Sequence, residues 1–305
     1  MPTYRGRVDA ARYKLTIAYD GTDFAGWQKQ EPPDPDVPPD EHGQRPRIQL
    51  RTVQHVVEQA VREVLREPSV HVKGASRTDS GVHAAGQVAA FTTRPEPERG
   101  VGWPVERGTE ALVRALNGKL PADVLVLDAE PTSLGFDPIG GAARKAYSYT
   151  IHSGPVRPLW DRRYVAWTYH GIDAAPMHEA ARHLIGEHDF VSFAQASHGR
   201  LTTVRTIFEC RVEDLAAGVE RGGPSAPGDR GSRGHPPGRR VRIYVEGSGF
   251  LYNMVRIIAG TLGEVGRGRR MPVDIPRIIA ARDRQAAGPT LPPEGLRLEW
   301  IEYPS

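Results

Sequence analysis

The order in which strand and helix patterns follow one another limits the fold of this chain more than any other feature. Residues 13–19 alternate like a strand and end at an Asp-Gly turn signal. Thr52 is then a predicted N-cap for a helix that runs to about Arg66. Its apolar residues recur at i, i+3, i+4, i+7 and i+8, as on one buried helix face: Val53, Val56, Val57, Ala60, Val61, Val64 and Leu65. Two short strands, a helix and a strand are predicted next, over residues 70–73, 87–93, 109–117 and 124–127.

The second half of the chain repeats this β-α-β-β-α-β order. The predicted elements are a strand, a helix, two strands, an apolar helix, a short extra helix and a last strand, over residues 147–151, 175–185, 206–212, 241–245, 250–265, 275–282 and 296–303. Two such units in succession predict an α+β fold made of two ferredoxin-like halves with antiparallel sheets. We expect domains of residues 1–134 and 135–305.

Composition sets the broad class of protein. A chain of 305 residues with 39% hydrophobic and 25% charged residues is typical of a soluble globular protein. No apolar run approaches the roughly 18 residues of a membrane span, and the N-terminus lacks a signal-peptide core. The single Cys210 excludes an internal disulfide framework and favours a cytoplasmic location. The pI of about 9.0 permits a polyanionic partner.

Two segments interrupt the repeated pattern. Residues 31–49 are rich in proline and carry five acids before Arg45 and Arg47, which predicts a surface insertion. Residues 216–240 are rich in glycine, proline and arginine and lie between two strands that should pair. A flexible hairpin tip is the preferred interpretation of this basic insertion, and a flap that contacts phosphates is the alternative.

Residues 74–84, with the sequence GASRTDSGVHA, place an arginine, a carboxylate and a histidine among small residues. The segment does not match a phosphate-binding P-loop or a nucleophile elbow, and elsewhere the chain has no zinc-ligand spacing and no dinucleotide fingerprint. The remaining candidate for a functional side chain is the carboxylate of Asp79, with Arg77 two residues before it. Asp79 is either an ordinary turn residue or a catalytic carboxylate.

Two features of the second half offer this carboxylate partners. Arg256 lies in an apolar helix, where a guanidinium needs a carboxylate or phosphate unless it reaches water along a polar stripe. Arg144 and Lys145 precede Tyr147 and Tyr149 on a strand. Cations beside alternating aromatic residues are typical of surfaces that stack nucleic-acid bases, although the tyrosines can equally be packing residues.

Taken together, these segments resemble the TruA family of tRNA pseudouridine synthases. The matching segments keep the family's order and cover nearly all the chain outside the two insertions: residues 19–28, 52–54, 74–84, 116–117, 120–121, 146–149, 186–190, 192–193, 204–207, 249–256, 286–290 and 295–296. The combination of Arg-Thr-Asp-x-Gly-Val-His with Asn-Met-Val-Arg carries most of the specificity.

The resemblance implies a mixed sheet with an active-site cleft between the halves. It also implies a homodimer that isomerises uridine at positions 38, 39 and 40 of the tRNA anticodon stem-loop, without metal or organic cofactor. By motif match Asp79 would be catalytic, Tyr147 would stack on the base and assist proton transfer, and Arg256 would pair with the aspartate. The further substrate-binding residues would be Arg77, Arg144, Lys145, Arg205 and Phe250. For Arg205 and Phe250, a surface arginine and a core phenylalanine are the alternatives.

The chemistry of the resemblance fits a carboxylate in either of two roles. Asp79 could attack the ribose or act as a base, and the sequence leaves both open. Gly74 and Gly81 are expected to let the backbone approach a flipped nucleotide. One departure is the segment 136–139, Phe-Asp-Pro-Ile, where many relatives have Phe-His-Ala-Arg and a basic RNA contact. Two rival hypotheses are a catalytically silent RNA-binding module and a hydrolase that uses Asp79 with His83.

Overall fold

The chain divides into two compact α+β units. The computed structural model describes residues 10–195, 202–215 and 238–304. The first unit comprises residues 1–142 and 300–305, and the second comprises residues 143–299. These bounds differ from those of the expected domains, because the last residues group with the first unit. The α+β class is confirmed, and no helix in the described ranges is long and apolar enough to cross a membrane.

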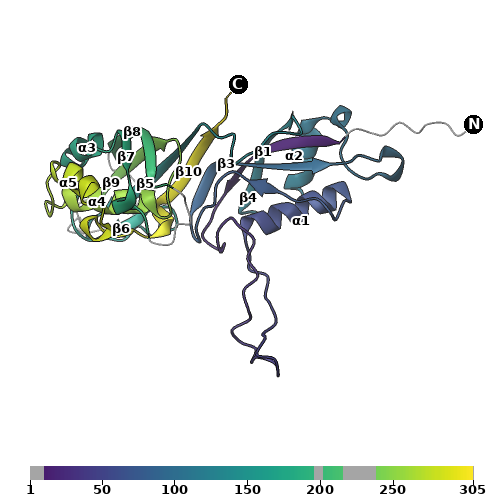
Figure 1. Ribbon diagram of the computed structural model, residues 1–305, viewed down its shortest axis with the longest axis horizontal. Helices are drawn as coiled ribbons and strands as arrows, with labels where there is room; N and C mark the ends of the chain where they lie inside the picture. Colours follow the sequence, from purple (N-terminus) through teal and green to yellow (C-terminus); the bar gives the residue numbers. More distant parts are fainter. Residues whose placement is uncertain (1–9, 196–201, 216–237, 305) are drawn as a thin grey trace, which may run out of the picture. The chain divides into compact units, whose positions relative to one another are not determined.

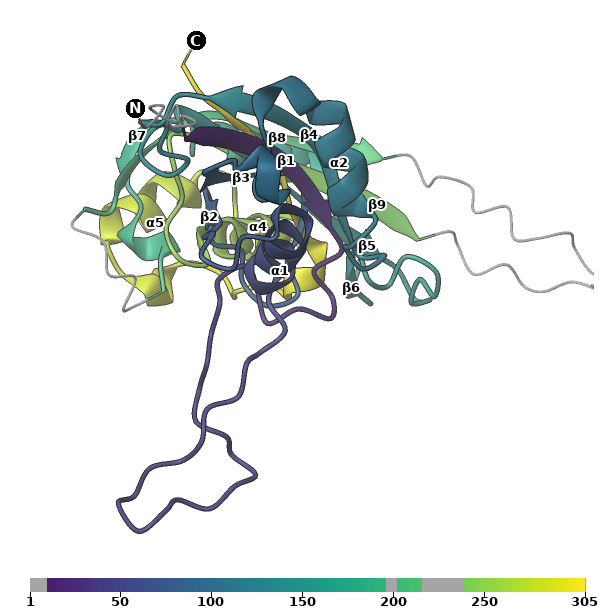
Figure 2. The same ribbon diagram turned by 90° about the vertical axis from the view of Figure 1, so that its right-hand side faces the viewer.

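The first unit is the predicted β-α-β-β-α-β motif (Figure 1). Its strands lie in the order β4-β1-β3-β2, and each neighbouring pair is antiparallel. Helices α1 and α2 cover one face of this sheet (Figure 2). Strand β1 therefore alternates, with Tyr13, Leu15, Ile17 and Tyr19 buried. The elements are β1 (Ala11–Tyr19), α1 (Val53–Leu65), β2 (Lys73–Gly74), β3 (His83–Thr93), α2 (Thr109–Asn117) and β4 (Val124–Thr132).

The second unit repeats the same strand order with two additions. Strands β10-β5-β9-β8 follow one another as β4-β1-β3-β2 do in the first unit, β7 extends the sheet beyond β8, and β6 pairs with β5 in parallel. Both β6 and β7 are absent from the sequence prediction. The elements are β5 (Arg144–Ser153), β6 (Ala166–Thr168), α3 (Ala174–Arg182), β7 (Gly186–Asp189), β8 (Val204–Leu215), β9 (Arg239–Gly247), α4 (Met254–Gly266), α5 (Asp274–Ala281) and β10 (Leu296–Glu302).

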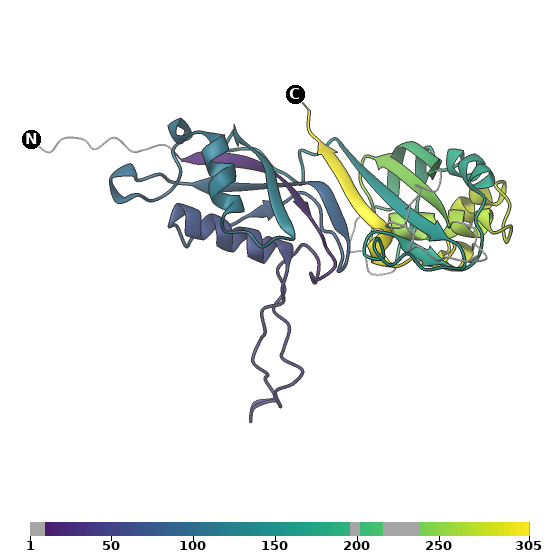
Figure 3. The same cartoon turned by 180° about the vertical axis from the view of Figure 1, so that it is seen from behind.

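The acidic insertion, residues 31–49, forms a hairpin-like arm that leaves the first unit beside α1 (Figure 3). Its two sides are held by backbone bonds from Asp34 N to Pro46 O at 2.7 Å and from Ile48 N to Pro32 O at 3.0 Å. The Asp40 carboxylate closes the tip by accepting the backbone N–H groups of His42 and Gln44. The arm is exposed along most of its length, as predicted for a surface insertion.

Most of the basic insertion, residues 216–237, lies outside the described residues. Its last two arginines, Arg239 and Arg240, belong to β9. Arg239 pairs with Asp214 at 2.5 Å, and Arg240 pairs with Asp161. Both arginines therefore form ion pairs within the second unit.

Two local predictions are wrong, those for the start of α4 and for the strand over residues 70–73, and the predicted cap of α1 is confirmed in position only. Helix α4 begins at Met254 and not at residue 250, because Asn253 adopts a left-handed conformation with φ of 60°. Thr52 is the N-cap residue of α1, as predicted, but its side chain makes no capping bond, and the first N–H groups of the helix donate instead to the carbonyls of Gly26 and Trp27. The strand predicted over residues 70–73 shrinks to Lys73 and Gly74.

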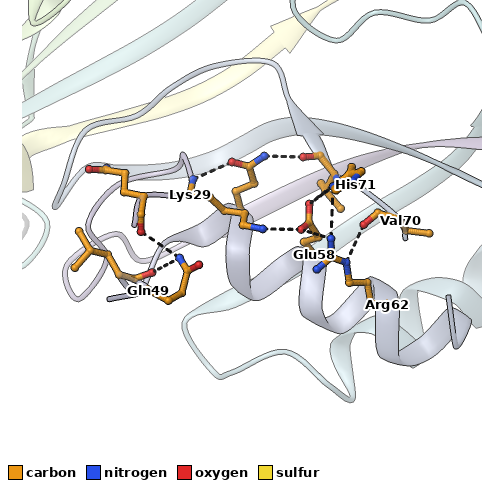
Figure 4. A network of polar contacts seen from close by, with 10 residues as sticks. Lys29, Gln49, Glu58, Arg62, Val70 and His71 are labelled. Carbon is orange, nitrogen blue, oxygen red and sulfur yellow. Dashed lines mark hydrogen bonds and ion pairs between the residues drawn. The ribbon is translucent and has the colours of Figure 1, made fainter. Parts of the chain in front are cut away.

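The shortened strand is explained by a buried carboxylate, Glu58 on α1 (Figure 4). Val72 N donates to Glu58 Oε2 at 3.0 Å, and Val72 O accepts a bond from the Gln54 amide at 2.8 Å, so neither group is free for a strand ladder. Glu58 Oε1 also pairs with Lys29 at 2.9 Å and with Arg62 at 2.7 Å. This Glu58 cluster ties the chain after residue 28, helix α1 and the segment before β2 to one another.

The charge of Glu58 is stabilised by its partners. Burial by itself raises the pKa of this carboxyl, but the bond from Val72 and the neighbouring Lys29 and Arg62 together lower the pKa below its usual value. A lowered folded-state pKa adds stability above the pKa of the unfolded chain, about 4.3. That stability is lost as the pH falls through the folded-state pKa.

We predict that Glu58→Gln lowers the free energy of unfolding by about 1–3 kcal/mol at pH 7, because two cations and a buried N–H lose their charged acceptor. Urea titrations at pH 7 and at pH 3 measure this difference, which shrinks at the lower pH. The matched control is Glu63→Gln, an exposed residue of the same helix paired with Lys119, for which we expect less than about 1 kcal/mol. Equal losses for both variants would contradict the anchoring role of Glu58.

Candidate active site

Asp79 lies in the loop of residues 75–82, which joins β2 to β3. We call it the catalytic loop after the role that the motif predicts for Asp79, and it packs against the loop of residues 20–28 that follows β1, which we call the cradle loop. Trp27 N donates to Thr78 O at 3.0 Å, and Gly81 N donates to Phe24 O at 3.3 Å. A turn bond from Val82 N to Asp79 O, at 3.1 Å, fixes the backbone around the carboxylate. The side chain of Asp79 is half-buried, whereas Arg77 is exposed.

The two loops approach so closely that only glycine fits at the contact. A Cβ atom on Gly21 would lie 1.9 Å from Val82 O, and one on Gly26 would lie 2.8 Å from Thr78 O. Gly26 also has a φ of +96°, which side chains rarely adopt. Both glycines belong to the segment 19–28, so this segment acts as a backbone cradle for the catalytic loop.

Gly74 has a role that the sequence did not suggest. A Cβ atom there would lie 2.2 Å from the indole ring of Trp27, so the glycine makes room for a buried tryptophan. Gly81 adopts a φ of +78°, and the turn after Asp79 therefore needs it for conformational reasons.

Buried polar side chains hold the catalytic loop from the sheet side. The hydroxyls of Tyr19 and Thr78 are 2.7 Å apart. The Gln87 amide bonds both backbone groups of Ser76, accepting from its N–H at 3.1 Å and donating to its carbonyl at 2.7 Å. The sequence analysis missed these positioning residues, although a glutamine in an otherwise apolar strand was the available signal.

His83 is part of the scaffold. Its buried ring accepts a bond at Nδ1 from Gly21 N, at 3.0 Å, and the same nitrogen lies 3.2 Å from Asp20 Oδ1. This nitrogen therefore joins the end of β1 to the start of β3. The arrangement disfavours the hydrolase hypothesis, in which the imidazole would face a reacting group.

In the second unit, Tyr147 on β5 is packed by Phe250. The two rings meet edge to face with centroids 5.1 Å apart, and Tyr147 is almost fully buried. Tyr149, two residues further along the strand, is fully buried and donates its hydroxyl to Pro292 O at 2.7 Å. The packing interpretation therefore holds for Tyr149, and Phe250 is a packing partner of Tyr147.

Arg256 is half-buried on α4 and is held by two oxygen acceptors of its own unit. Its Nε donates to Leu291 O at 2.7 Å, and its NH1 group donates to Asn253 Oδ1 at 2.8 Å. These bonds orient the guanidinium plane. The expected pairing of Arg256 with Asp79 stays a prediction.

The remaining basic candidates occupy different environments. Arg144 pairs with Glu246 at 2.9 Å and lies over the ring of Phe208 at 4.7 Å. Arg205 is half-buried, and its NH1 group donates to Thr202 O at 3.1 Å. Lys145 is half-buried beside Arg144. Their contacts to RNA stay predictions.

The departure at residues 136–139 has a structural function. Asp137 forms an ion pair with Lys73 at 2.9 Å and accepts a bond from Ile139 N at 3.0 Å. The bond from Lys73 is the main reason that the pKa of Asp137 is lowered. Phe136 packs on Tyr303, with ring centroids 4.9 Å apart. The segment thus joins β2 to the C-terminal residues within the first unit.

In the described ranges of the chain, no group of three or more His, Cys, Asp or Glu side chains could hold a metal ion. Cys210 is buried, and burial raises the pKa of its thiol to about 12. The thiolate needed for cysteine catalysis is therefore disfavoured.

Comparison with known proteins gives a consistent result. A family model described as tRNA pseudouridine synthase matches residues 15–138 and 180–304. The tRNA pseudouridine synthase A of Caldicellulosiruptor saccharolyticus is 37% identical over 95% of this chain and 98% of its own length. The proteins of the same name from Geobacter sulfurreducens and Oleidesulfovibrio alaskensis are 38% and 40% identical, over 95% and 96% of this chain and 98% and 97% of their own lengths. The chain therefore belongs to the tRNA pseudouridine synthase family.

Proposed function

We propose that this enzyme isomerises uridine to pseudouridine in tRNA, at positions 38, 39 and 40 of the anticodon stem-loop, with Asp79 as the essential catalytic group. Family membership supports the reaction, and the positions follow from the motif resemblance. The observation that carries the catalytic assignment is the frame around Asp79. The backbone cradle holds the loop that carries this half-buried carboxylate. The hydroxyl pair of Tyr19 and Thr78 and the amide of Gln87 hold the same loop.

The reaction needs no redox partner. The C1′–N1 bond between ribose and base breaks, and a C1′–C5 bond forms after the uracil turns. C5 loses one proton and N1 gains one, so product and substrate have the same composition. Asp79 can attack C1′ as a nucleophile, or it can take a proton from the ribose and lead through a glycal. Both roles require the ionised carboxylate, and a nearby guanidinium such as that of Arg256 would favour this form.

Tyr147 is proposed to stack on the flipped uracil and to assist proton transfer at the base. Phe250 supports this role because its edge-to-face contact fixes the phenol ring. A uridine in a stem reaches Asp79 only when it leaves the helix, which costs a few kcal/mol. Stacking on Tyr147 and phosphate contacts by Arg77, Lys145 and Arg205 would offset this cost.

We also propose that the enzyme acts in the cytoplasm as a homodimer. The motif resemblance supports the dimer, and the single buried cysteine fits a reducing compartment.

We predict that Asp79→Asn lowers the rate of pseudouridine formation by at least about 10³-fold and leaves tRNA binding unchanged within about threefold, because asparagine keeps the shape of the side chain and loses its charge. Unmodified tRNA transcripts are incubated with each variant, and pseudouridine is mapped by position. Asp128→Asn, an exposed residue of β4, serves as the control with normal activity. Pseudouridine made by the Asp79→Asn variant at the normal rate would sink the assignment, and modification outside positions 38–40 would correct the substrate site.

We predict that Tyr147→Phe slows single-turnover isomerisation by about 10²-fold with little change in tRNA affinity, because the ring still stacks but the hydroxyl is lost. Tyr149→Phe is the matched control. It loses a bond to Pro292 O, which lowers the free energy of unfolding by about 1 kcal/mol, and it keeps its turnover rate. Equal rates for the wild-type and Tyr147→Phe proteins would exclude proton transfer by this hydroxyl.

A further inference from the structure

Asn253, the residue immediately before α4, has an unusual backbone conformation. Its φ and ψ angles are 60° and 8°, in the left-handed region. This region is unfavourable for a residue with a side chain, although asparagine tolerates it better than most residues, whereas glycine adopts it freely. The chain thus has an asparagine where glycine would be least strained, and such a strained position calls for a function of the side-chain amide.

The amide of Asn253 does not cap the helix. An asparagine at the position before a helix ordinarily accepts a bond from one of the first backbone N–H groups. The Asn253 side chain makes no such bond, and the residue serves the helix only through its carbonyl, which accepts from Ile257 N at 3.0 Å. The side-chain oxygen is directed to a different donor.

That donor is the guanidinium of Arg256, three residues further along the chain. Asn253 Oδ1 accepts a bond from its NH1 group at 2.8 Å. A guanidinium only donates hydrogen bonds, so the amide atom that faces it is the oxygen. At its other end, the amide nitrogen donates to Gln195 Oε1. Because both ends of the amide are bonded, it cannot turn without losing a bond, and the oxygen keeps its direction.

A main-chain acceptor holds the guanidinium at a second nitrogen. Arg256 Nε donates to Leu291 O at 2.7 Å, and Leu291 N donates back to Arg256 O at 3.3 Å. This segment approaches α4 so closely that a Cβ atom on Gly260 would lie 1.8 Å from Pro289 O. Close packing of the backbone therefore fixes the Leu291 carbonyl. Of the two acceptors, the amide of Asn253 is the one that a substitution can remove.

The segment 250–256 supports both of the side chains that the proposed reaction uses from the second unit. Phe250 packs edge to face on Tyr147, with ring centroids 5.1 Å apart. Three residues later, Asn253 binds Arg256. One short stretch of chain thus contacts the phenol ring and the guanidinium at the same time.

We propose that Asn253 is a positioning residue, whose left-handed backbone and side-chain amide together set the direction of the Arg256 guanidinium. The inference rests on the proposed function, in which this guanidinium favours the ionised form of Asp79. A guanidinium presents its N–H groups in one plane, so its orientation decides which groups reach a carboxylate. Donors that are held in place before the reaction need no rearrangement in the transition state.

The test separates the amide of residue 253 from its backbone conformation. Asn253→Gly removes the amide and keeps the left-handed conformation, whereas Asn253→Ala removes the amide and strains the backbone. Asn117→Ala is the matched control, because the Asn117 amide bonds the backbone of Val126 in the first unit, at 2.9 and 2.8 Å. For each full-length variant we measure the single-turnover rate on unmodified tRNA transcripts, the tRNA dissociation constant and the urea midpoint.

We expect Asn253→Gly and Asn253→Ala to lower the single-turnover rate equally, by about tenfold, because each loses one bond to a charged group. Both variants keep a tRNA dissociation constant within about threefold of the wild type, since the amide orients a side chain and does not bind the RNA. Asn253→Ala lowers the urea midpoint more than Asn253→Gly does. Asn117→Ala lowers the midpoint and keeps the rate. Rate then follows the amide, and stability follows the backbone.

A double-mutant cycle with Arg256→Lys tests whether the amide acts through the guanidinium. Lysine keeps the positive charge but has no planar group for the amide to orient. We expect Arg256→Lys alone to slow the single-turnover reaction by about tenfold. Adding Asn253→Gly to this variant then slows it further by less than about twofold, because the two residues act as one unit.

Four results would overturn the proposal. They are a wild-type rate for Asn253→Gly, a rate that falls in step with tRNA affinity, a normal rate for Arg256→Lys beside a slow Asn253→Gly, and an effect of Asn253→Gly that is as large in the Arg256→Lys background as in the wild type. Asp79→Asn is measured in the same assay as the reference. A normal rate for Asp79→Asn would contradict the proposed function, so the two failures are distinguished.

Discussion

A single buried carboxylate, that of Glu58, joins three segments on which the position of the catalytic loop depends. Its oxygens hold Lys29 after the cradle loop, Arg62 on α1 and the backbone of Val72 before β2. Because a buried charge is stable only when its partners are in place, the three segments are fixed together. The acid therefore acts as a structural anchor at a distance from the proposed chemistry.

A series of backbone contacts connects this anchor to the loop that carries Asp79. The first N–H groups of α1 bind the carbonyls of Gly26 and Trp27, and Trp27 N in turn binds Thr78 O. Gly74 makes space for the indole of the same tryptophan. From the other side, Tyr19 and Gln87 hold the loop to the sheet. The backbone that carries Asp79 is thus placed by main-chain contacts on one side and by buried polar side chains on the other.

The sequence predicted the features that local patterns encode. The apolar stripe of α1, the alternation of β1 and the repeated β-α-β-β-α-β order are confirmed, since each depends on the period of one element. The strand predicted over residues 70–73 is reduced to its end because Glu58 and Gln54 bind the backbone groups of Val72, and these partners lie 14 and 18 residues away in the chain. Strand β7 contains glycine and three polar residues and carries no apolar signal. Asp79 is predicted from its motif and stays a prediction, whereas Trp27, Thr78 and Gln87 make long-range contacts to its loop that no spacing reveals.

The close fit between the cradle loop and the catalytic loop limits how the motif can be reused. A graft of GASRTDSGVHA into another scaffold would lack the carbonyl of Phe24, the N–H of Trp27 and the hydroxyl of Tyr19, and its aspartate would have no fixed direction. The smallest transferable piece is the whole of β1, α1, β2 and β3 with their loops. For the same reason, substitutions at Gly21, Gly26, Trp27 and Gly74 are coupled, and evolution is expected to change these positions as a group.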